Sequence, residues 1–348
     1  MRFVQSLMAT AQAGILLLLA LLWPARAAGE TADALARFEF SEPQMGVPFR
    51  IVFYARDAQV AKIAAEAAFK RVADLNAIMS DYETDSELNE LSRTSGRGKA
   101  VHVSDDLWAV LERAQGFAAE SDGAFDVTVG PVVSHWRKAR RTHQMPAADS
   151  LSEALKAVGY TKMRLSAADH TVELTAPRMK LDLGGIAKGY ALDEELKVLA
   201  QHGITRVLAT GAGDMAIGDP PPGKTGWRIE IAPLDITNAP PKVFVSLARV
   251  GLATSGDVFQ RLEIEGKRYS HIVDPHTGIG LTDHSLVTVI APDCTTAEGL
   301  SKIVSVLGPA RGLEFVENTP KAAAHIVRAP DGQIQMRESR RFRNFVED

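Results

Sequence analysis

The chain has 348 residues, enough for one large domain or two closely packed ones. Its hydrophobic content of 46% and charged content of 24% are those of an ordinary globular protein. A formal net charge of −4, with no long run of Lys and Arg, argues against nucleic acid as a partner.

The first 28 residues have the features of a cleaved signal peptide. Arg2 supplies a positive start, Ala13–Trp23 is apolar, and Ala25-Arg26-Ala27 matches an A-x-A cleavage site. The apolar segment has 11 residues, against the ~20 that a membrane-spanning helix needs. The sole cysteine, Cys294, is far from the cleavage site and cannot carry a lipid there. We therefore expect a periplasmic protein whose mature chain, 29–348, has no membrane-spanning segment.

The N-terminal third predicts two strands followed by helices. The strands are Phe38–Phe40 and Gly46–Tyr54, and apolar residues recur at helical spacing from Val60 to Met79. Thr84-x-x-Glu87 matches a capping box before a second, short helix, which places Tyr82 in the approach to that helix.

A third helix is predicted from Ser104 to the terminator Ser121-Asp122-Gly123. After it, Ala124–Val129 alternates like a strand, and the basic segment 137–148 is interpreted as an irregular, solvated excursion. Val172–Leu174 is expected to pair with Leu181–Leu183.

The C-terminal half mixes helices and strands without a regular βαβ alternation. A helix is predicted from Ile186 to Gly203 and another from Thr295 to Leu307. This order favours the α+β class, with mixed or antiparallel sheets packed against helices. The predicted strands are Val207–Thr210, Trp227–Ile231, Val243–Leu247, Val250–Ala253 and Ser285–Ile290.

The stretch from Leu181 to Ala191 joins a predicted strand to the central helix through Gly184-Gly185. A helix start after a glycine turn presents free N–H groups and a positive dipole end to an anion. Neither G-x-G-x-x-G nor G-x-x-x-x-G-K-[ST] occurs there, so no standard nucleotide fingerprint applies. By itself the stretch is equally compatible with a joint that binds no ligand.

The run Tyr269 to Gly278 places His271 near a strand end, followed by Asp-Pro and Thr-Gly turn residues. A histidine there could act as a general base or contact phosphate, although a single turn histidine is more often structural. No H-E-x-x-H, C-x-x-C or G-x-S-x-G occurs, which argues against zinc and against an α/β-hydrolase. Thr254–Asp257 could be a helix cap or a hydroxyl cluster.

Seven short segments that occur in a fixed order along the chain identify a protein family more specifically than any one of them does alone. This series resembles the ApbE family of FAD:protein FMN transferases and spans nearly the whole mature chain. The resemblance implies an ApbE-like, T-fold-like architecture. The segments are Met45-Gly46, Tyr82-x-x-Asp85-Ser86-x-Leu88, Gly123-Ala124-Phe125-Asp126, Asp182-Leu183-Gly184-Gly185-x-Ala187-Lys188-Gly189, Gly213-Asp214, Ser255-Gly256-Asp257 and His271-Ile272-x-Asp274-Pro275-x-Thr277-Gly278.

The resemblance implies that the chain binds FAD and moves its FMN half onto a Thr or Ser hydroxyl of a target protein, releasing AMP. The expected target is a flavin-carrying subunit of an exported or membrane redox complex. His271 is implied as the acceptor of the hydroxyl proton, while positioning and charge neutralisation supply most of the catalysis. The implied FAD contacts are Met45, Tyr82, Ala124, Phe125, Asp126, Asp182, Lys188 and Ile272.

The resemblance also implies Mg²⁺, held by the backbone carbonyl of Gly185 and a helix start of the type Ala-Asp-x-x-[Ser/Thr]-Thr. Here that segment reads Ala297-Glu298-Gly299-Leu300-Ser301-Lys302, which leaves Glu298 and Ser301 as candidate ligands. Lys302 stands where a Thr ligand is usual, and a protonated Lys cannot bind a metal ion. Two readings follow: the Lys302 ammonium takes the metal position and neutralises diphosphate charge, or Lys302 simply pairs with Glu298.

Three activities are consistent with these residues. The first is FMN transfer, which we favour because the expected base and FAD contacts are present. The second is binding and delivery of FAD with little transfer, because the metal site has changed. The third is hydrolysis of FAD to FMN and AMP, in which water replaces the target hydroxyl.

Overall fold

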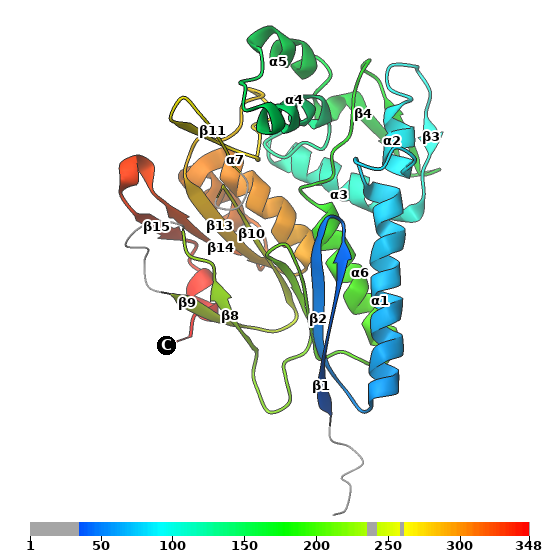
Figure 1. The fold of residues 1–348 in the computed structure, drawn as a ribbon, viewed down its shortest axis with the longest axis vertical. Coiled ribbons are helices and arrows are strands. Elements are labelled where there is room, and N and C mark those ends of the chain that lie inside the picture. Colours follow the sequence, from blue (N-terminus) through cyan, green and yellow to red (C-terminus); the bar gives the residue numbers. More distant parts are fainter. Residues whose placement is uncertain (1–34, 235–241, 258–260, 348) are drawn as a thin grey trace, which may run out of the picture. The chain divides into compact units, whose positions relative to one another are not determined.

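The computed structural model describes residues 35–234, 242–257 and 261–347. The expected signal peptide lies outside this range. Within the unit Leu35–Asp348, an eight-stranded antiparallel sheet runs in the order β1-β2-β6-β7-β10-β13-β14-β15 (Figure 1). Its strands are β1 (Ala36–Gln44), β2 (Val47–Ala55), β6 (Val207–Gly211), β7 (Asp214–Ile217), β10 (Val250–Gly256), β13 (Ser285–Ala291), β14 (Ala323–Arg328) and β15 (Gln335–Glu338).

Helices α1 (Ala58–Met79), α6 (Ala187–Gln201) and α7 (Cys294–Asn318) pack together against one face of this sheet. The hairpin of β8 (Trp227–Ile231) and β9 (Val243–Leu247) contributes to a second core on the other face. Side chains alternate between the faces: Ile51 and Phe53 of β2 join the helical core, whereas Val52 joins the second one. The inner strands are therefore mostly apolar in sequence, and β2, β6, β10 and β13 were predicted, whereas β7, β14 and β15 were missed.

The remaining elements form the upper part of Figure 1. A three-stranded sheet has the order β3-β5-β4, and β11 pairs with β12. These elements are α2 (Glu87–Ser92), β3 (Val101–His102), α3 (Asp105–Glu120), α4 (Gly130–Thr142), α5 (Ala148–Leu155), β4 (Met163–Ser166), β5 (Thr171–Leu174), β11 (Arg261–Ile264) and β12 (Lys267–Ser270), with a 3-10 turn at Tyr160–Lys162. Two further 3-10 turns, Pro330–Gly332 and Phe342–Phe345, lie elsewhere, and the second contacts β9 and β14.

The α+β class and the long helices are confirmed, but several local predictions are wrong. Helix α2 is capped by Ser86, whose hydroxyl accepts from the Asn89 N–H, and not by Thr84. Ala124–Val129 forms bends and turns instead of a strand, because the Ser121 and Asp126 side chains accept from its N–H groups. Within the described residues, a single parallel bridge, from Val129 to Lys180, joins it to the neighbouring segment. Leu181–Leu183 pairs with no strand, since β5 already lies between β3 and β4.

The first half of the basic segment predicted as irregular, residues 137–142, is the end of helix α4. Pro131 occupies the first turn, where its missing N–H costs nothing. Val132, Trp136 and Ala139 then recur at helical spacing and are buried. The many basic residues concealed this short apolar stripe.

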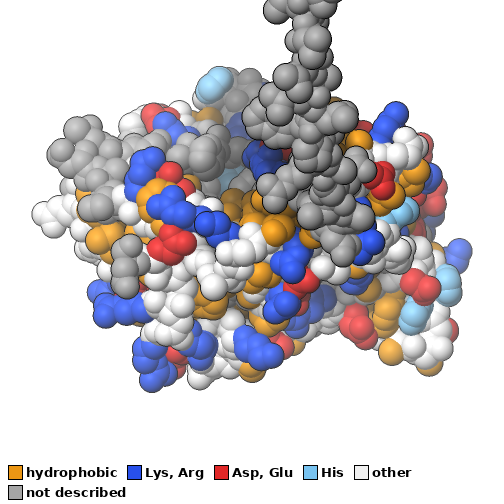
Figure 2. Space-filling view, turned by 90° about the horizontal axis from the view of Figure 1, so that it is seen from below, with side chains coloured by type: hydrophobic (Ala, Val, Ile, Leu, Met, Phe, Trp, Pro, Cys, Tyr) orange, Lys and Arg blue, Asp and Glu red, His pale blue; other side chains and the backbone are white. Residues whose placement is uncertain are grey.

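Helix α7 is longer than predicted but is interrupted at Gly308, whose φ of 73° is not helical. Pro309 follows it and cannot donate to the preceding turn. None of the helices within the described residues has the length and apolarity to cross a membrane. On the face drawn in Figure 2, Lys and Arg side chains are scattered among acidic and apolar ones.

The buried residue Glu195 on α6 makes the stability of the fold depend on pH. It is fully buried, neither carboxylate oxygen has a hydrogen-bond partner among the residues that the structure describes, and burial raises its pKa from 4.5 to about 8. The unfolded chain therefore binds fewer protons than the folded chain between these two values, so stability falls as pH rises, by about 4 kcal/mol at pH 8. We expect Glu195→Gln to flatten this slope in urea unfolding measured from pH 5 to 8. Parallel pH profiles for the two proteins would contradict the prediction.

Candidate active site

A cavity of about 690 Å³ opens between the main sheet and the upper elements. Its volume is within the range of pockets that enclose a cofactor-sized ligand. Sequence segments from the whole described chain meet at its wall. The predicted residues that border it are Met45, Tyr82, Ala124, Phe125, Asp126, Asp182, Gly185, Lys188, His271, Ile272 and Lys302.

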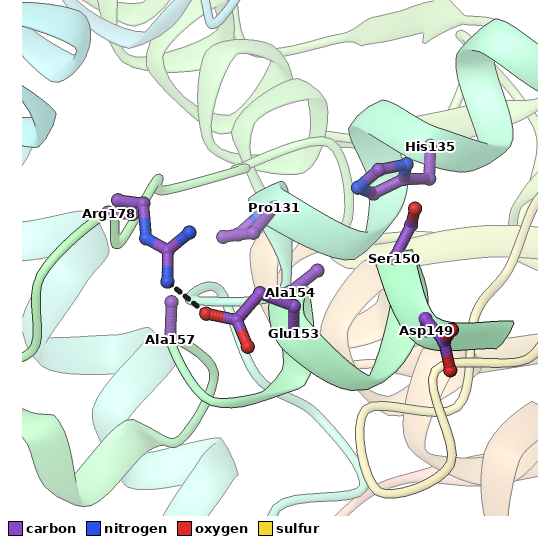
Figure 3. A pocket seen from close by; sticks show the side chains of 8 residues that line it. All are labelled: Pro131, His135, Asp149, Ser150, Glu153, Ala154, Ala157 and Arg178. Atoms are coloured by element: carbon purple, nitrogen blue, oxygen red, sulfur yellow. Dashed lines mark hydrogen bonds and ion pairs between the residues drawn. The ribbon is translucent and has the colours of Figure 1, made fainter. Parts of the chain in front are cut away.

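A second hollow, of about 430 Å³, lies between α4 and α5 and contains none of the predicted residues (Figure 3). Arg178 and Glu153 form an ion pair at its edge, with side chains 70% and 44% exposed. Exposed ion pairs contribute little, so this hollow offers no desolvated polar group for a ligand.

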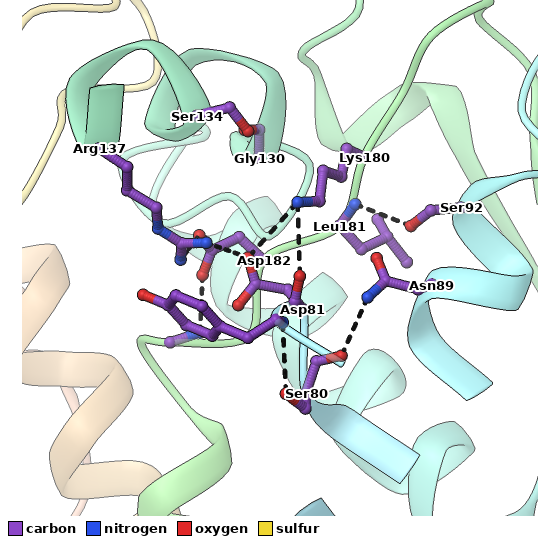
Figure 4. A network of polar contacts seen from close by, with 12 residues as sticks. Ser80, Asp81, Asn89, Ser92, Gly130, Ser134, Arg137, Lys180, Leu181 and Asp182 are labelled. Carbon is purple, nitrogen blue, oxygen red and sulfur yellow. Dashed lines mark hydrogen bonds and ion pairs between the residues drawn. The ribbon is translucent and has the colours of Figure 1, made fainter. Parts of the chain in front are cut away.

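One wall of the large cavity is an ion-pair network centred on Arg137 of α4 (Figure 4). Its guanidinium donates to Asp182 Oδ2 at 2.8 Å and also pairs with Asp81. Lys180 adds a further cation 3.7 Å from Asp81. Burial, and next the charge of Asp81, raises the pKa of Asp182, while Arg137 opposes both. The second Asp182 oxygen accepts from the Gly184 N–H at 2.8 Å, which fixes the glycine turn.

Tyr82 lies over this network and is 74% exposed. The Arg137 guanidinium carbon is 4.3 Å from the centre of its ring. A cation over an aromatic face stabilises the ring's position. The opposite face of the ring is therefore a candidate platform for a planar ligand group.

The loop that carries Ala124, Phe125 and Asp126 is held by its own polar atoms. The Ser121 hydroxyl accepts from the Phe125 N–H at 3.1 Å, and Asp126 Oδ1 accepts from the Thr128 N–H at 2.8 Å. Burial raises the pKa of Asp126. From the histidine loop, His276 Nε2 lies 2.8 Å from the carbonyl oxygen of Asp122 and links the two loops.

His271 follows the last residue of β12, as predicted for a histidine near a strand end, and its half-buried side chain borders the cavity. Thr254 and Ser255 are strand residues of β10, so the helix-cap reading of this segment is wrong. The hydroxyl-cluster reading is confirmed: the Ser255 and Ser301 hydroxyls are 2.6 Å apart, and those of Thr254 and Thr288 are 3.2 Å apart.

Two lysines and two buried carboxylates lie at the inner end of the cavity. Lys188 pairs with Glu298 and lies 3.4 Å from Asp214 Oδ2. Burial alone would lower the pKa of Lys188, but the charges of Glu298 and then Asp214 raise it above its ordinary value. Burial raises the pKa of Asp214 to about 6 although Lys188 opposes this. Glu298 thus pairs with Lys188 of α6, and not with Lys302 as one reading proposed.

Lys302 donates from Nζ to the Ser255 hydroxyl at 2.5 Å. Burial lowers its pKa, and the nearby charges of Glu298 and Asp214 partly offset this. Glu298 and Ser301, the predicted metal ligands on α7, are both fully buried and do not border the cavity. Among the described residues, no three His, Cys, Asp or Glu side chains are grouped so that they could hold a metal ion.

The ApbE family model matches residues 45–326, which include every segment of this cavity wall. The chain belongs to the ApbE family. It is 33% identical over 281 residues to a Haemophilus influenzae protein named FAD:protein FMN transferase, a match that covers 79% of this chain and 81% of the relative. A Treponema pallidum protein of the same name is 31% identical over 298 residues, covering 82% of each chain.

Solved ApbE structures have the same fold. The flavin transferase ApbE from Vibrio cholerae matches with a TM-score of 0.80 at 26% identity, covering 90% of this chain and 100% of that one. The ApbE protein from Thermotoga maritima gives a TM-score of 0.80 at 28% identity, and the match again covers 90% of this chain and 100% of that one. These likenesses confirm the family and the ApbE-like architecture.

Sequence reasoning missed Arg137, Asp81 and Arg140, which all border the cavity of this ApbE protein. The signal that could have found Arg137 is the stripe of Val132, Trp136 and Ala139, which places residues 137 and 140 on the other side of one helix. Asp81 had no such signal, because its role depends on a partner 56 positions away in the chain.

Proposed function

We propose that this chain is an FAD:protein FMN transferase, which moves FMN from FAD onto a Thr or Ser hydroxyl of a target protein and releases AMP. The family and the names of its relatives support the transferase class. The observation that carries the proposal is one cavity that combines an exposed aromatic ring, half-buried lysines and a histidine. Those are the groups needed to hold a flavin dinucleotide and to move one proton.

The FAD contacts are assigned by their place on the wall. Tyr82 offers an open ring face, while Met45 and Ile272 add apolar contact. Lys188 and Lys302 lie where they can offset diphosphate charge, which is the main requirement of phosphoryl transfer. Asp182 is the carboxylate that the Arg137 network holds in one orientation.

In the transfer step the target hydroxyl oxygen attacks the phosphorus on the FMN side of the diphosphate. The new P–O bond forms as the bridging P–O bond breaks, and AMP leaves with that electron pair. His271 takes the hydroxyl proton, because it is the one histidine among the described residues that border the cavity. In-line displacement needs the hydroxyl and the leaving oxygen on opposite sides of the phosphorus.

Mg²⁺ is implied by the family resemblance, but the residues present do not fit it. Both Glu298 oxygens already accept from protein donors, Lys188 Nζ and the Gly189 N–H. The Ser301 hydroxyl donates to the Glu298 carbonyl oxygen at 2.7 Å. Mg²⁺ requires near-octahedral oxygen ligands at short range, which this donor set does not leave available. We therefore propose no step of the reaction that uses a metal ion.

The partner that this function requires is an exported or membrane-bound redox subunit with an accessible Thr or Ser. The signal-peptide features of residues 1–28 support a periplasmic location. We propose both on these grounds, with 29–348 as the mature chain.

The test is to incubate the full mature chain with FAD and a flavin-accepting domain. We expect a fluorescent covalent band and one AMP per modified target, and no band when the target's acceptor Thr is replaced by Ala. AMP release with no covalent band would instead indicate FAD hydrolysis. Tight FAD binding with neither product would indicate a delivery protein and contradict the proposal.

A further inference from the structure

We infer that the Lys302 ammonium replaces a divalent metal ion in this chain, so that it binds FAD and transfers FMN without Mg²⁺. The inference rests on the proposed function for its second half. Its first half, metal-independent FAD binding, can be measured alone.

The Lys302 side chain occupies the space beside Gly185, whose carbonyl is the expected metal ligand. A methyl group added at Gly185 would lie 3.3 Å from Cγ of Lys302. The side chain ends on Ser255 Oγ at 2.5 Å and borders the cavity. A cation is therefore already fixed by packing and hydrogen bonding beside the expected metal position.

The oxygen atoms around that position are already hydrogen-bonded to protein donors. Glu298 is fully buried and accepts from the Gly189 N–H at 2.8 Å as well as from Lys188. The Ser255 and Ser301 hydroxyls bond each other at 2.6 Å. A metal ion would have to displace these donors and leave them buried without partners, which is costly.

The charges of the cluster balance without a metal ion. Asp214 and Glu298 supply two negative charges, and Lys188 and Lys302 supply two positive ones, when all four are ionised. A neutral Thr at position 302 would leave one negative charge in excess and favour an added cation. In the absence of FAD, adding Mg²⁺ to the present cluster would leave two positive charges in excess.

The ammonium can perform the electrostatic part of the metal's role. Lys acts as a compact point charge with rotatable donors and is a common phosphate-binding group. Lys302 borders the same cavity as Lys188, so the two can approach a bound diphosphate together. Unlike a metal ion, this charge cannot be removed by a chelator.

The experiment compares FAD binding, followed by flavin fluorescence, in EDTA and in Mg²⁺ for the mature wild type, Lys302→Thr and Lys62→Thr. Lys62 of α1 is a matched control, with a side chain 65% exposed and outside the cavity wall. We expect the wild type and Lys62→Thr to bind FAD equally in both buffers. Lys302→Thr should lose about ten- to a hundredfold in EDTA, the cost of one charge-assisted hydrogen bond. Mg²⁺ should restore part of this loss, because the variant frees the Ser255 hydroxyl from Lys302, adds the Thr hydroxyl and leaves one negative charge in excess.

Thermal unfolding checks that each variant is folded and supplies a second readout. Mg²⁺ should raise the melting temperature of Lys302→Thr, but not that of the wild type. Loss of wild-type FAD binding in EDTA, restored by Mg²⁺, would overturn the inference. If the wild type binds FAD in EDTA but modifies the target only in Mg²⁺, the second half of the inference fails and the transferase proposal stands. If it binds FAD in EDTA and modifies no target in either buffer, metal-independent binding stands and the transferase proposal fails.

Discussion

Lys188→Met is expected to lower the free energy of unfolding by about 3–5 kcal/mol at neutral pH, the typical cost of breaking a buried ion pair. Glu298 and Asp214 are 0% and 2% exposed, so neither can regain water when Lys188 is removed. Lys302 would then be the remaining neighbouring cation for two carboxylates. Because Glu298 also accepts from the Gly189 N–H, the loss should loosen the contact between α6 and α7.

The loss of stability caused by Lys188→Met should become smaller as the pH falls. Without Lys188 the folded-state pKa of Asp214, which burial already raises to about 6, rises further above its unfolded value. Groups with raised folded pKa values destabilise the protein above the unfolded pKa and cease to do so below it. Urea unfolding at pH 5 and pH 8 should therefore show a smaller difference between variant and wild type at pH 5.

Two control variants separate the effect of losing the Lys188 charge from the effect of losing its packing contacts. Lys197→Met removes another lysine from the same helix, but its side chain is 67% exposed, so it should cost no more than about 1 kcal/mol. Lys188→Met with Glu298→Gln removes both charges, and part of the stability should return. A loss under about 1 kcal/mol for Lys188→Met alone would mean that the buried pair does not hold the two helices.

The sequence predicted most of the fold because its apolar patterns are strong. The inner strands of the main sheet are largely buried, although the edge strands β1 and β15 are mostly exposed. Helix α1 has apolar residues at regular helical spacing from Ala61 to Met79. Ala124–Val129 looked like a strand because every second residue is apolar, but its Asp126 and Thr128 bond each other and favour a turn. Local periodicity cannot show such a preference.

The site was predicted as a set of residues but not as a set of interactions. The FAD and catalytic candidates do meet at one cavity, although they come from segments between positions 45 and 302. Their partners were not predictable: Glu298 could pair with Lys302 one turn away or with a distant residue, and the fold brings Lys188 closer. This pairing depends on how α6 and α7 pack together, and the spacing of residues along the chain does not reveal that packing.

His271→Ala is expected to lower kcat for FMN transfer by about 10²–10⁴-fold, the usual contribution of a positioned general base. FAD affinity should change far less, because Tyr82, Lys188 and the other wall residues remain.

The matched control is His276→Ala, five positions along the same loop. His276 does not border the cavity, and its ring contacts the Asp122 carbonyl that supports the Ala124–Asp126 loop. Its loss should therefore raise KM for FAD more than it lowers kcat. If His271→Ala keeps kcat within about threefold of wild type, the proton leaves by another route and His271 only shapes the wall. A kcat loss in His271→Ala that His276→Ala does not share ties the proton transfer to the histidine at the end of β12.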